Sequence, residues 1–177
     1  MNNKKYLIAY ATMSGSTREI AEEIARVLNS QYRQADVCAC RSVASLEDYD
    51  AVILGTALYM FHIHHDAARF LKRHQKQLPS LPIAVFAGGP YGPNYDADAV
   101  EVRKNIDTEL AKFAWLRPVS VQLVGGRFDP ARLRFPYNLI PAMKQAPPSD
   151  SRNWEEIRAW ANSLTSPFEN SLQSRPV

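Results

Sequence analysis

Four hydroxyl side chains and one glycine are concentrated in the short stretch "TMSGST", residues 12–17. Hydroxyl groups can donate hydrogen bonds to the oxygens of an anion, and a glycine lets the backbone adopt a conformation that other residues resist. This combination suits a phosphate group that is held by hydroxyls and backbone amides, without a lysine. The candidate binding residues are Thr12, Met13, Ser14, Gly15, Ser16 and Thr17.

The flanking sequences place this stretch at the start of a helix. The preceding run "YLIAYA" is apolar and strand-like, and the following run "REIAEEIARVL" has helical periodicity. Backbone amides at the start of a helix carry partial positive charge and attract phosphate. The missing lysine excludes a nucleoside-triphosphate loop, and the single glycine excludes the dinucleotide fingerprint. Two interpretations remain open: a monophosphate site, or a helix start rich in capping residues.

Strand-like and helical segments alternate along the chain, which predicts a parallel, doubly wound α/β sheet. The predicted strands span residues 5–11, 35–41, 50–55, 82–87 and 119–124, and the predicted helices span residues 17–30, 64–77, 97–114 and 151–164. In such a sheet, ligands bind beyond the carboxyl ends of the strands, which is where the hydroxyl-rich stretch lies. We predict one domain over residues 1–165 with a long insertion at 127–150, followed by a flexible tail over 166–177.

The composition is that of an ordinary globular protein. The chain has 177 residues, of which 46% are hydrophobic and 22% charged, with a net charge of +3. No apolar run approaches the roughly 20 residues of a membrane span. The amino terminus runs directly into the first strand, so a cytoplasmic protein is expected. Cys38 and Cys40 are interpreted as small apolar residues of a strand, and no nucleic-acid partner is predicted.

The letters T-M-S-G-S-T resemble the flavodoxin phosphate loop, T-x-[ST]-G-x-T, which holds the phosphate of FMN. The strand before the loop, the helix after it and the alternation of five strands with helices strengthen the resemblance, which covers about residues 4–165. It implies a flavodoxin-like three-layer sandwich, in which a five-stranded parallel sheet of order 2-1-3-4-5 has helices on both faces. It also implies that the cofactor is FMN.

The flavin ring is then expected on two later loops, one after the third strand and one after the fourth. These loops, residues 55–65 and 87–95, carry tyrosines that can stack on the isoalloxazine ring and glycines whose amides can approach its edge. An exposed loop aromatic is the alternative interpretation of each tyrosine. The residues expected at the ring are Ala57, Leu58, Tyr59, Gly88, Gly89, Tyr91, Gly92 and Tyr95.

Three histidines, His62, His64 and His65, lie in the first of these loops. A metal site is not predicted, because no thiol or carboxylate completes it apart from Asp66, which is expected to cap or begin the next helix. An imidazole beside a flavin can donate or relay a proton. Solvated residues at the start of a helix are the other interpretation, and both remain open.

The insertion at residues 127–150 is too long for an ordinary strand-to-helix connection, and connections of this length often carry function. It combines arginines with apolar and aromatic side chains. Arg127, Arg132 and Arg134 are predicted to dock a redox partner protein, a quinone or an anionic substrate. Residues 127–146 are predicted to contact a membrane surface peripherally. A solvated loop that packs its aromatic side chains on the domain is the alternative.

The chain is also similar to the flavodoxin-like menaquinone-dependent protoporphyrinogen dehydrogenases. The shared features are "TREIA" after the first loop, the H-x-H of His62 and His64, the basic and aromatic insertion, and Trp154 and Glu155 at the start of the last helix. The resemblance implies oxidation of a porphyrinogen-type tetrapyrrole by FMN and transfer of electrons to a quinone, in the cytoplasm or on the inner face of the membrane. No catalytic side chain is predicted, because the redox chemistry belongs to the cofactor.

Two other functions remain open. One is a flavodoxin-type electron carrier that serves a partner reductase, for instance one that reduces a tetrapyrrole. The other is a flavin-free interaction domain that has kept the fold.

Overall fold

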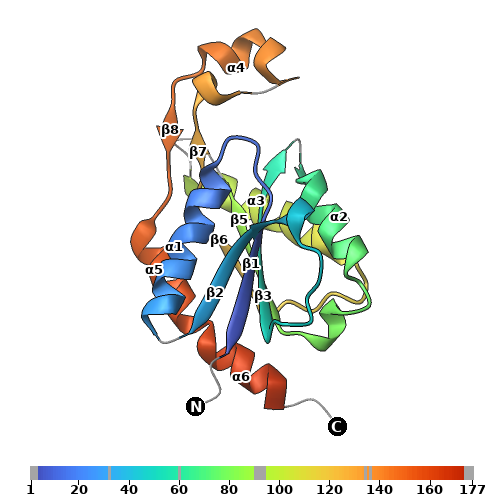
Figure 1. Cartoon of the computed structure of the whole chain (residues 1–177). Coiled ribbons are helices and arrows are strands. Elements are labelled where there is room, and N and C mark those ends of the chain that lie inside the picture. The colour runs from blue at the N-terminus through green and yellow to red at the C-terminus, as the bar shows by residue number, and fades with distance from the viewer. Residues whose placement is uncertain are drawn as a thin grey trace.

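The computed structural model describes residues 4–31, 33–59, 61–89, 95–133, 135 and 137–173. Five parallel strands form a central sheet in the order β2-β1-β3-β5-β6, with helices on both faces (Figure 1). They are β1 (Lys5–Tyr10), β2 (Gln34–Ala39), β3 (Ala51–Tyr59), β5 (Ile83–Gly88) and β6 (Ser120–Leu123). This confirms the predicted 2-1-3-4-5 order, because β4 (His62–Ile63) is a short antiparallel partner of β3.

The main helices cover the two faces of the sheet. They are α1 (Ser16–Ser30), α2 (His65–Arg73), α3 (Tyr95–Ala111), α5 (Trp154–Ser163) and α6 (Thr165–Gln173), with 3-10 turns η1 (Cys40–Ser42) and η2 (Leu78–Ser80). Tyr6 and Ile8 of β1 pack with α1, α5 and α6, whereas Leu7 and Ala9 pack with α2 and α3. Both faces of β1 are therefore apolar, as a parallel sheet covered on two sides requires.

Helix α1 sets the position of the hydroxyl-rich loop. Ile20, Ile24 and Leu28 recur at helical spacing and are fully buried against the sheet, so one face of the helix is anchored. The helix follows β1, which lies between β2 and β3 near the middle of the sheet. The loop that joins β1 to α1 therefore lies at the carboxyl ends of the strands, where folds of this class bind their ligands.

Strand β3 is longer than predicted. It continues four residues past Gly55, to Tyr59, and its last two residues pair with β4 across a turn at Phe61. The first two residues of the extension pair with β5 and the last two with β4, which is why the strand continues past Gly55. The segment expected to be an open loop is thus mostly a β-hairpin. Helix α2 is shorter than predicted and ends at Arg73.

The segment after α5 differs from the flexible tail expected over residues 166–177. Residues Thr165–Gln173 form α6, and Phe168 is fully buried, with its ring 5.4 Å from that of Tyr6 in an edge-on contact. An ion pair of 3.0 Å between Glu169 and Arg33 adds a second connection to the domain. One buried apolar side chain in a polar segment, Phe168, docks this helix. Residues 174–177 lie outside the described part of the chain.

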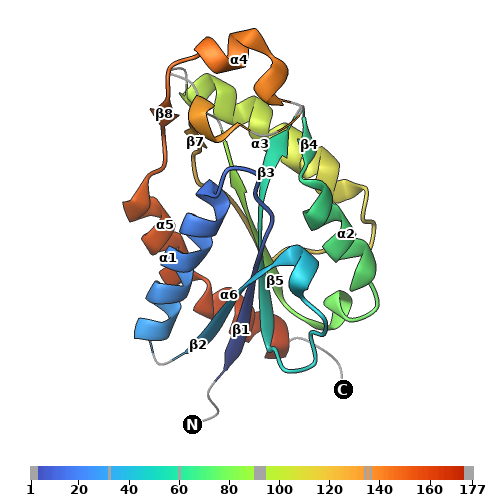
Figure 2. The same cartoon turned by 45° about the horizontal axis from the view of Figure 1, so that its top comes forward.

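The insertion is folded, and its two ends are joined by backbone hydrogen bonds. Its first and last residues form the antiparallel pair β7 (Arg127–Phe128) and β8 (Ser149–Asp150), and the amide of Ser151 donates to the carbonyl of Gly126. Between the strands lie η3 (Pro130–Arg132), η4 (Tyr137–Leu139) and α4 (Pro141–Gln145). Figure 2 shows α4 beyond the carboxyl ends of the parallel strands, whereas α6 and the start of β1 lie at the opposite end.

No helix in the part of the chain that the structure describes combines the length and the apolar composition needed to cross a membrane.

Candidate functional site

The loop between β1 and α1 has the backbone geometry expected of an anion site. Gly15 has a φ of +95°, in the left-handed region that favours glycine. Its amide donates to Thr12 Oγ1 at 2.9 Å, which curls the loop, and its carbonyl accepts the first helical hydrogen bond from the amide of Glu19 at 3.1 Å. The Thr12 hydroxyl accepts this bond and keeps its own hydrogen for a further acceptor.

Thr17 provides the test of whether the loop fits a phosphate. Its side chain is 1% exposed, and its hydroxyl Oγ1 has no hydrogen-bond partner in the described part of the chain. Leaving a buried hydroxyl unpaired costs about 1–3 kcal/mol. The first amides of any helix have no intrahelical acceptor. Helix α1 begins at Ser16 without a side-chain cap, so no capping side chain supplies an acceptor either. A ligand oxygen at this point would satisfy both, so the residues present fit a phosphate group.

The ends of β3 and β5 lie beside this loop, as predicted. β1, β3 and β5 are neighbours in the sheet, and Ala57 pairs with Gly88 across the last two. Ala57 is buried, so it can offer a ligand only its backbone, whereas Leu58 is half-buried. The structure therefore brings together the first loop and the carboxyl ends of the two strands that were expected to hold the flavin ring.

Gly89, directly after β5, connects the sheet to the segment that leads into the insertion. Gly89 has a φ of +129°, and its amide donates to the carbonyl of Gly125 at 2.9 Å. This amide is engaged within the protein, in contrast to the expectation that it donates to a ring edge. Tyr91 and Gly92 lie outside the described residues. Tyr59 ends β3 and Tyr95 begins α3, but their side chains are not among those described, so stacking by these tyrosines stays a prediction.

His64 is the cap of α2, and Asp66, which was expected to cap or begin this helix, lies in its first turn. The ring is 6% exposed, and Nδ1 accepts a hydrogen bond from the amide of Asp66 at 3.1 Å. Burial, reinforced by the neighbouring His65, lowers the pKa of His64 against the opposing effect of Asp66. The lowered pKa favours the neutral imidazole, which keeps Nδ1 able to accept the hydrogen bond from Asp66.

His62 is connected to a buried carboxylate that the sequence pattern did not reveal. His62 Nδ1 lies 3.1 Å from Glu109 Oε1, the amide of Ile63 donates to Oε2 at 3.3 Å, and Lys112 contacts the same carboxylate. Burial alone would raise the pKa of Glu109, but the hydrogen bonds from Lys112, His62 and Ile63 outweigh it and lower the pKa. The carboxylate fastens the β4 hairpin to α3, which borders the site.

His64, His65 and Asp66 also bring potential metal ligands within 4.8 Å of one another. However, His64 uses Nδ1 to cap α2, and His65 pairs with Asp66 at 3.1 Å and stacks on His64. The arrangement is accounted for by the start of the helix, and the prediction that no metal binds here stays a prediction.

Glu19, in the first turn of α1, is the centre of a charge cluster beside the loop. Arg152 Nη1 lies 2.7 Å from Glu19 Oε2, while Arg127 Nη1 and Arg132 Nη1 each lie 3.5 Å from Glu19 Oε1. Arg127 and Arg132 are two of the three arginines predicted to dock a partner, and this docking stays a prediction. Both pair with α1, so two segments more than one hundred residues apart along the chain are joined at the candidate site.

Arg152 is the residue of this cluster that sequence reasoning missed. Its side chain is 5% exposed, it contacts Asp150 at 2.6 Å, and its guanidinium lies 4.7 Å from the centre of the Trp154 ring. The hydrogen bond from Arg152 lowers the pKa of Asp150. No local pattern distinguishes Arg152 from exposed arginines. Arg134, the third predicted docking residue, lies outside the described residues.

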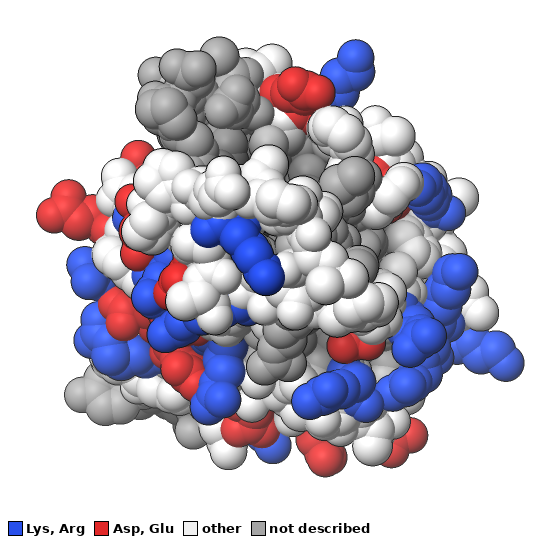
Figure 3. Space-filling model, turned by 90° about the horizontal axis from the view of Figure 1, so that it is seen from above, with Lys and Arg blue, Asp and Glu red and all other residues white. Residues whose placement is uncertain are grey.

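The surface above the site is partly apolar. Seen from the insertion side, its centre is largely uncharged and charged residues lie mainly around the rim (Figure 3). Three large side chains of the insertion contribute to exposed apolar area: Phe135 is 75% exposed, Leu139 66% and Ile140 41%. Exposed apolar side chains grouped in one segment are typical of a contact surface.

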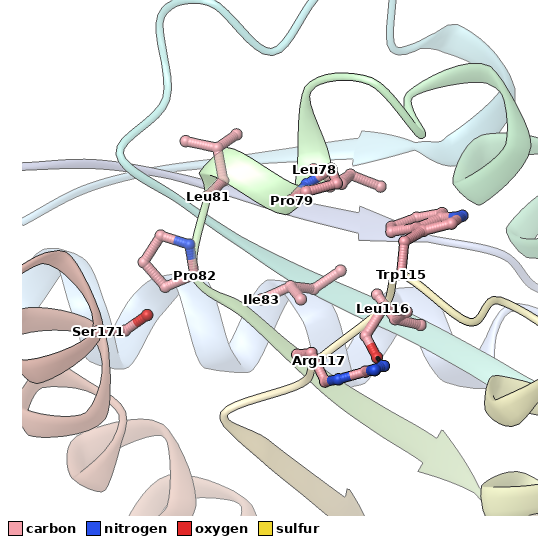
Figure 4. Close-up of a pocket in the computed structure, with 9 residues that line it drawn as sticks. All are labelled: Leu78, Pro79, Leu81, Pro82, Ile83, Trp115, Leu116, Arg117 and Ser171. Carbon is pink, nitrogen blue, oxygen red and sulfur yellow. Dashed lines mark hydrogen bonds between the residues drawn. The ribbon is translucent and has the colours of Figure 1, made fainter. Parts of the chain in front are cut away.

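A cavity at the other end of the sheet does not belong to this site. It has a volume of about 130 Å³ and lies at the amino end of β5, where Trp115, Leu116 and Ser171 surround Pro82 and Ile83 (Figure 4). Ligand sites usually have volumes of about 300–1,000 Å³. The cavity is too small for a flavin or a tetrapyrrole, and it lies opposite the phosphate-loop edge.

Residues 7–140 match the flavodoxin domain family. Protoporphyrinogen IX dehydrogenase [quinone] of Escherichia coli (strain K12) is 35% identical over 85 residues, 47% of this chain and 47% of that protein. The protein of the same name from Leishmania major is 28% identical over 124 residues, 68% of this chain and 52% of that protein. The matches therefore span about half the length of these curated relatives.

Among solved structures, oxidised flavodoxin 1 from Bacillus cereus superposes with a TM-score of 0.58 at 20% identity, covering 94% of this chain and 98% of that one. At this identity the likeness establishes the fold. The family match extends over most of the chain and includes the hydroxyl-rich loop, the hairpin after β3 and the start of the insertion. The chain therefore belongs to the flavodoxin domain family, and its cofactor is FMN.

Proposed function

We propose that this protein is an FMN-dependent oxidoreductase that oxidises a porphyrinogen-type tetrapyrrole and passes the electrons to a quinone. Membership of the flavodoxin domain family supports the redox role, and the names of the E. coli and Leishmania relatives support the substrate and the acceptor. The observation that carries the cofactor site is the buried, unpaired hydroxyl of Thr17 beside the uncapped start of α1.

In this proposal the loop residues hold the phosphate. The amides at the start of α1 and the hydroxyls of the loop donate to its oxygens, and Gly15 shapes the loop. The residues assigned to it are Thr12, Met13, Ser14, Gly15, Ser16 and Thr17. Bound FMN supplies the redox chemistry, because it can accept a hydride or single electrons. The chain contributes the pocket, the orientation of the ring and the exclusion of water.

The ring is assigned to the ends of β3 and β5. Ala57 and Gly88 are adjacent across these strands, and their position beside the phosphate loop supports a ring that lies over this edge. The remaining residues assigned to the ring are Leu58, Tyr59, Tyr91, Gly92 and Tyr95. Aromatic stacking on the ring would contribute about 1 kcal/mol beyond the burial of area.

The insertion is assigned to the partner. Phe135, Leu139 and Ile140 expose apolar area at the same end of the molecule as the phosphate loop, which suits a quinone, the flat face of a tetrapyrrole or a membrane surface. Arg127 and Arg134 are assigned to the carboxylates of the substrate.

The test is an anaerobic assay of the purified, FMN-loaded protein with protoporphyrinogen and a soluble menaquinone analogue. We expect porphyrin fluorescence to rise as quinol forms, since the hydrogen lost by the porphyrinogen must appear on the quinone. Omitting either the protein or the quinone should abolish the rise. If porphyrinogen leaves the bound flavin oxidised while a flavodoxin reductase reduces it, the protein is an electron carrier and the proposal fails.

A further inference from the structure

We infer that Arg132 of the insertion holds the phosphate of FMN, so that the insertion forms part of the cofactor site as well as lying above it. Arg132 Nη1 is the nearest atom to the position that a Cβ on Gly15 would occupy, at 3.9 Å. Gly15 is the residue around which the phosphate loop curls. A guanidinium therefore lies against a loop whose own residues carry no charge. The inference rests on the proposed phosphate site.

The contacts of Arg132 leave it available to a ligand. Within the described part of the chain it is paired with Glu19 at 3.5 Å and with Asp129 at 3.4 Å, and its side chain is 46% exposed. Charge-assisted hydrogen bonds have lengths of about 2.7–2.9 Å, so both pairs are loose. A guanidinium has five N–H donors, and these two pairs do not saturate it.

The other two arginines of the cluster are placed differently. Arg152 is 5% exposed and makes contacts of 2.7 Å with Glu19 and 2.6 Å with Asp150, so its donors are committed to the protein. Arg127 pairs with Glu19 at 3.5 Å and is not among the atoms near Gly15. Arg152 thus compensates the charge of Glu19 in the first turn of α1, which would otherwise repel a phosphate. Among the described arginines of this cluster, Arg132 is therefore the one that can turn toward the ligand.

The chemistry favours this assignment over a purely structural ion pair. A helix start offers a phosphate dianion the equivalent of only about half a positive charge. Hydroxyls and amides add hydrogen bonds but no net charge. A guanidinium adds a full charge and a planar fork of donors that matches phosphate oxygens. The site would thereby distinguish FMN from riboflavin more strongly than the loop alone.

The test is a fluorescence titration of the apo-protein with FMN and with riboflavin. Arg132→Gln should weaken FMN binding about tenfold or more, equivalent to about 1.4 kcal/mol, and leave riboflavin binding nearly unchanged. The ³¹P resonance of bound FMN should shift in this variant while the flavin absorbance band stays in place. Arg132→Lys should restore part of the affinity. The salt dependence of FMN binding should be weaker in Arg132→Gln than in the wild type.

Arg103→Gln is the matched control, because Arg103 is 48% exposed and pairs with Asp107 on α3, away from the loop. It should leave the affinities for both flavins unchanged. If Arg132→Gln keeps the wild-type preference for FMN, the inference is wrong. A Thr17→Val variant in the same titration separates a failure of this inference from a failure of the proposed phosphate site. If Thr17→Val reduces the preference for FMN and Arg132→Gln does not, the role of Arg132 is excluded and the proposed phosphate site stands. If neither does, the phosphate lies elsewhere and the proposed site fails as well.

Discussion

Replacing Thr17 with valine should have opposite effects on the apo-protein and on cofactor binding. Valine keeps the shape of the side chain and removes the hydroxyl, which is 1% exposed at the residue level and unpaired in the described part of the chain. Removing a buried, unsatisfied hydroxyl relieves a cost of about 1–3 kcal/mol, reduced by whatever water reaches it. The free energy of unfolding of the apo-protein should therefore stay constant or rise.

The affinity for FMN should fall in the same variant. A hydrogen bond to a charged acceptor contributes about 1.5–3 kcal/mol, which corresponds to a loss of about tenfold or more. Urea unfolding of the apo-protein and fluorescence titration with FMN and riboflavin measure the two quantities. Thr17→Ser is the control, because it keeps the hydroxyl and should retain most of the affinity for FMN. An apo-protein destabilised by more than about 1 kcal/mol together with unchanged FMN binding would refute the assignment, because the hydroxyl would then have an internal role.

Three further predictions concern the loop, the hairpin and the last helix. Gly15→Val should weaken FMN binding about tenfold, because a β-branched residue resists a φ of +95°, and a flavin titration measures the loss. Glu109→Gln should lower the free energy of unfolding near neutral pH. Since the folded pKa of Glu109 is lowered, its contribution exists above the unfolded pKa of about 4.3 and disappears as the pH falls through the folded value, so urea midpoints of variant and wild type should converge in acid. Phe168→Ala should destabilise the domain by about 3–5 kcal/mol, whereas a loose tail would lose nothing measurable by thermal unfolding.

The sequence by itself determined the sheet, its order of strands through the family resemblance, and the position of the hydroxyl-rich loop at the start of α1. These depend on local properties. Apolar side chains such as Leu7 and Ile8 occupy both faces of one strand, helical spacing recurs from Ile20 to Leu28, and a glycine stands where the loop needs a positive φ. Each of these patterns lies within a few residues, so the sequence alone is enough to place the strand, the helix and the turn.

Tertiary structure alone decided how the other segments close around that loop. The continuation of β3 depends on its pairing with β5 and β4, and His64 caps α2 while its backbone amide donates to Thr56 of β3. A single buried Phe168 docks a segment whose composition is that of a tail. In each case a neighbour in space outweighs the local propensity.

The charge cluster at α1 is the strongest case. Glu19 and Arg152 are 133 positions apart, and Arg132 meets Gly15 across a similar interval of sequence. Nothing in the local pattern of the insertion tells an arginine that faces solvent from one that faces the phosphate loop. The β7–β8 pair returns the chain to α5 beside α1, and this closure brings Arg127, Arg132 and Arg152 to Glu19. Only the folded chain shows that Arg152 is buried whereas Arg132 stays partly exposed.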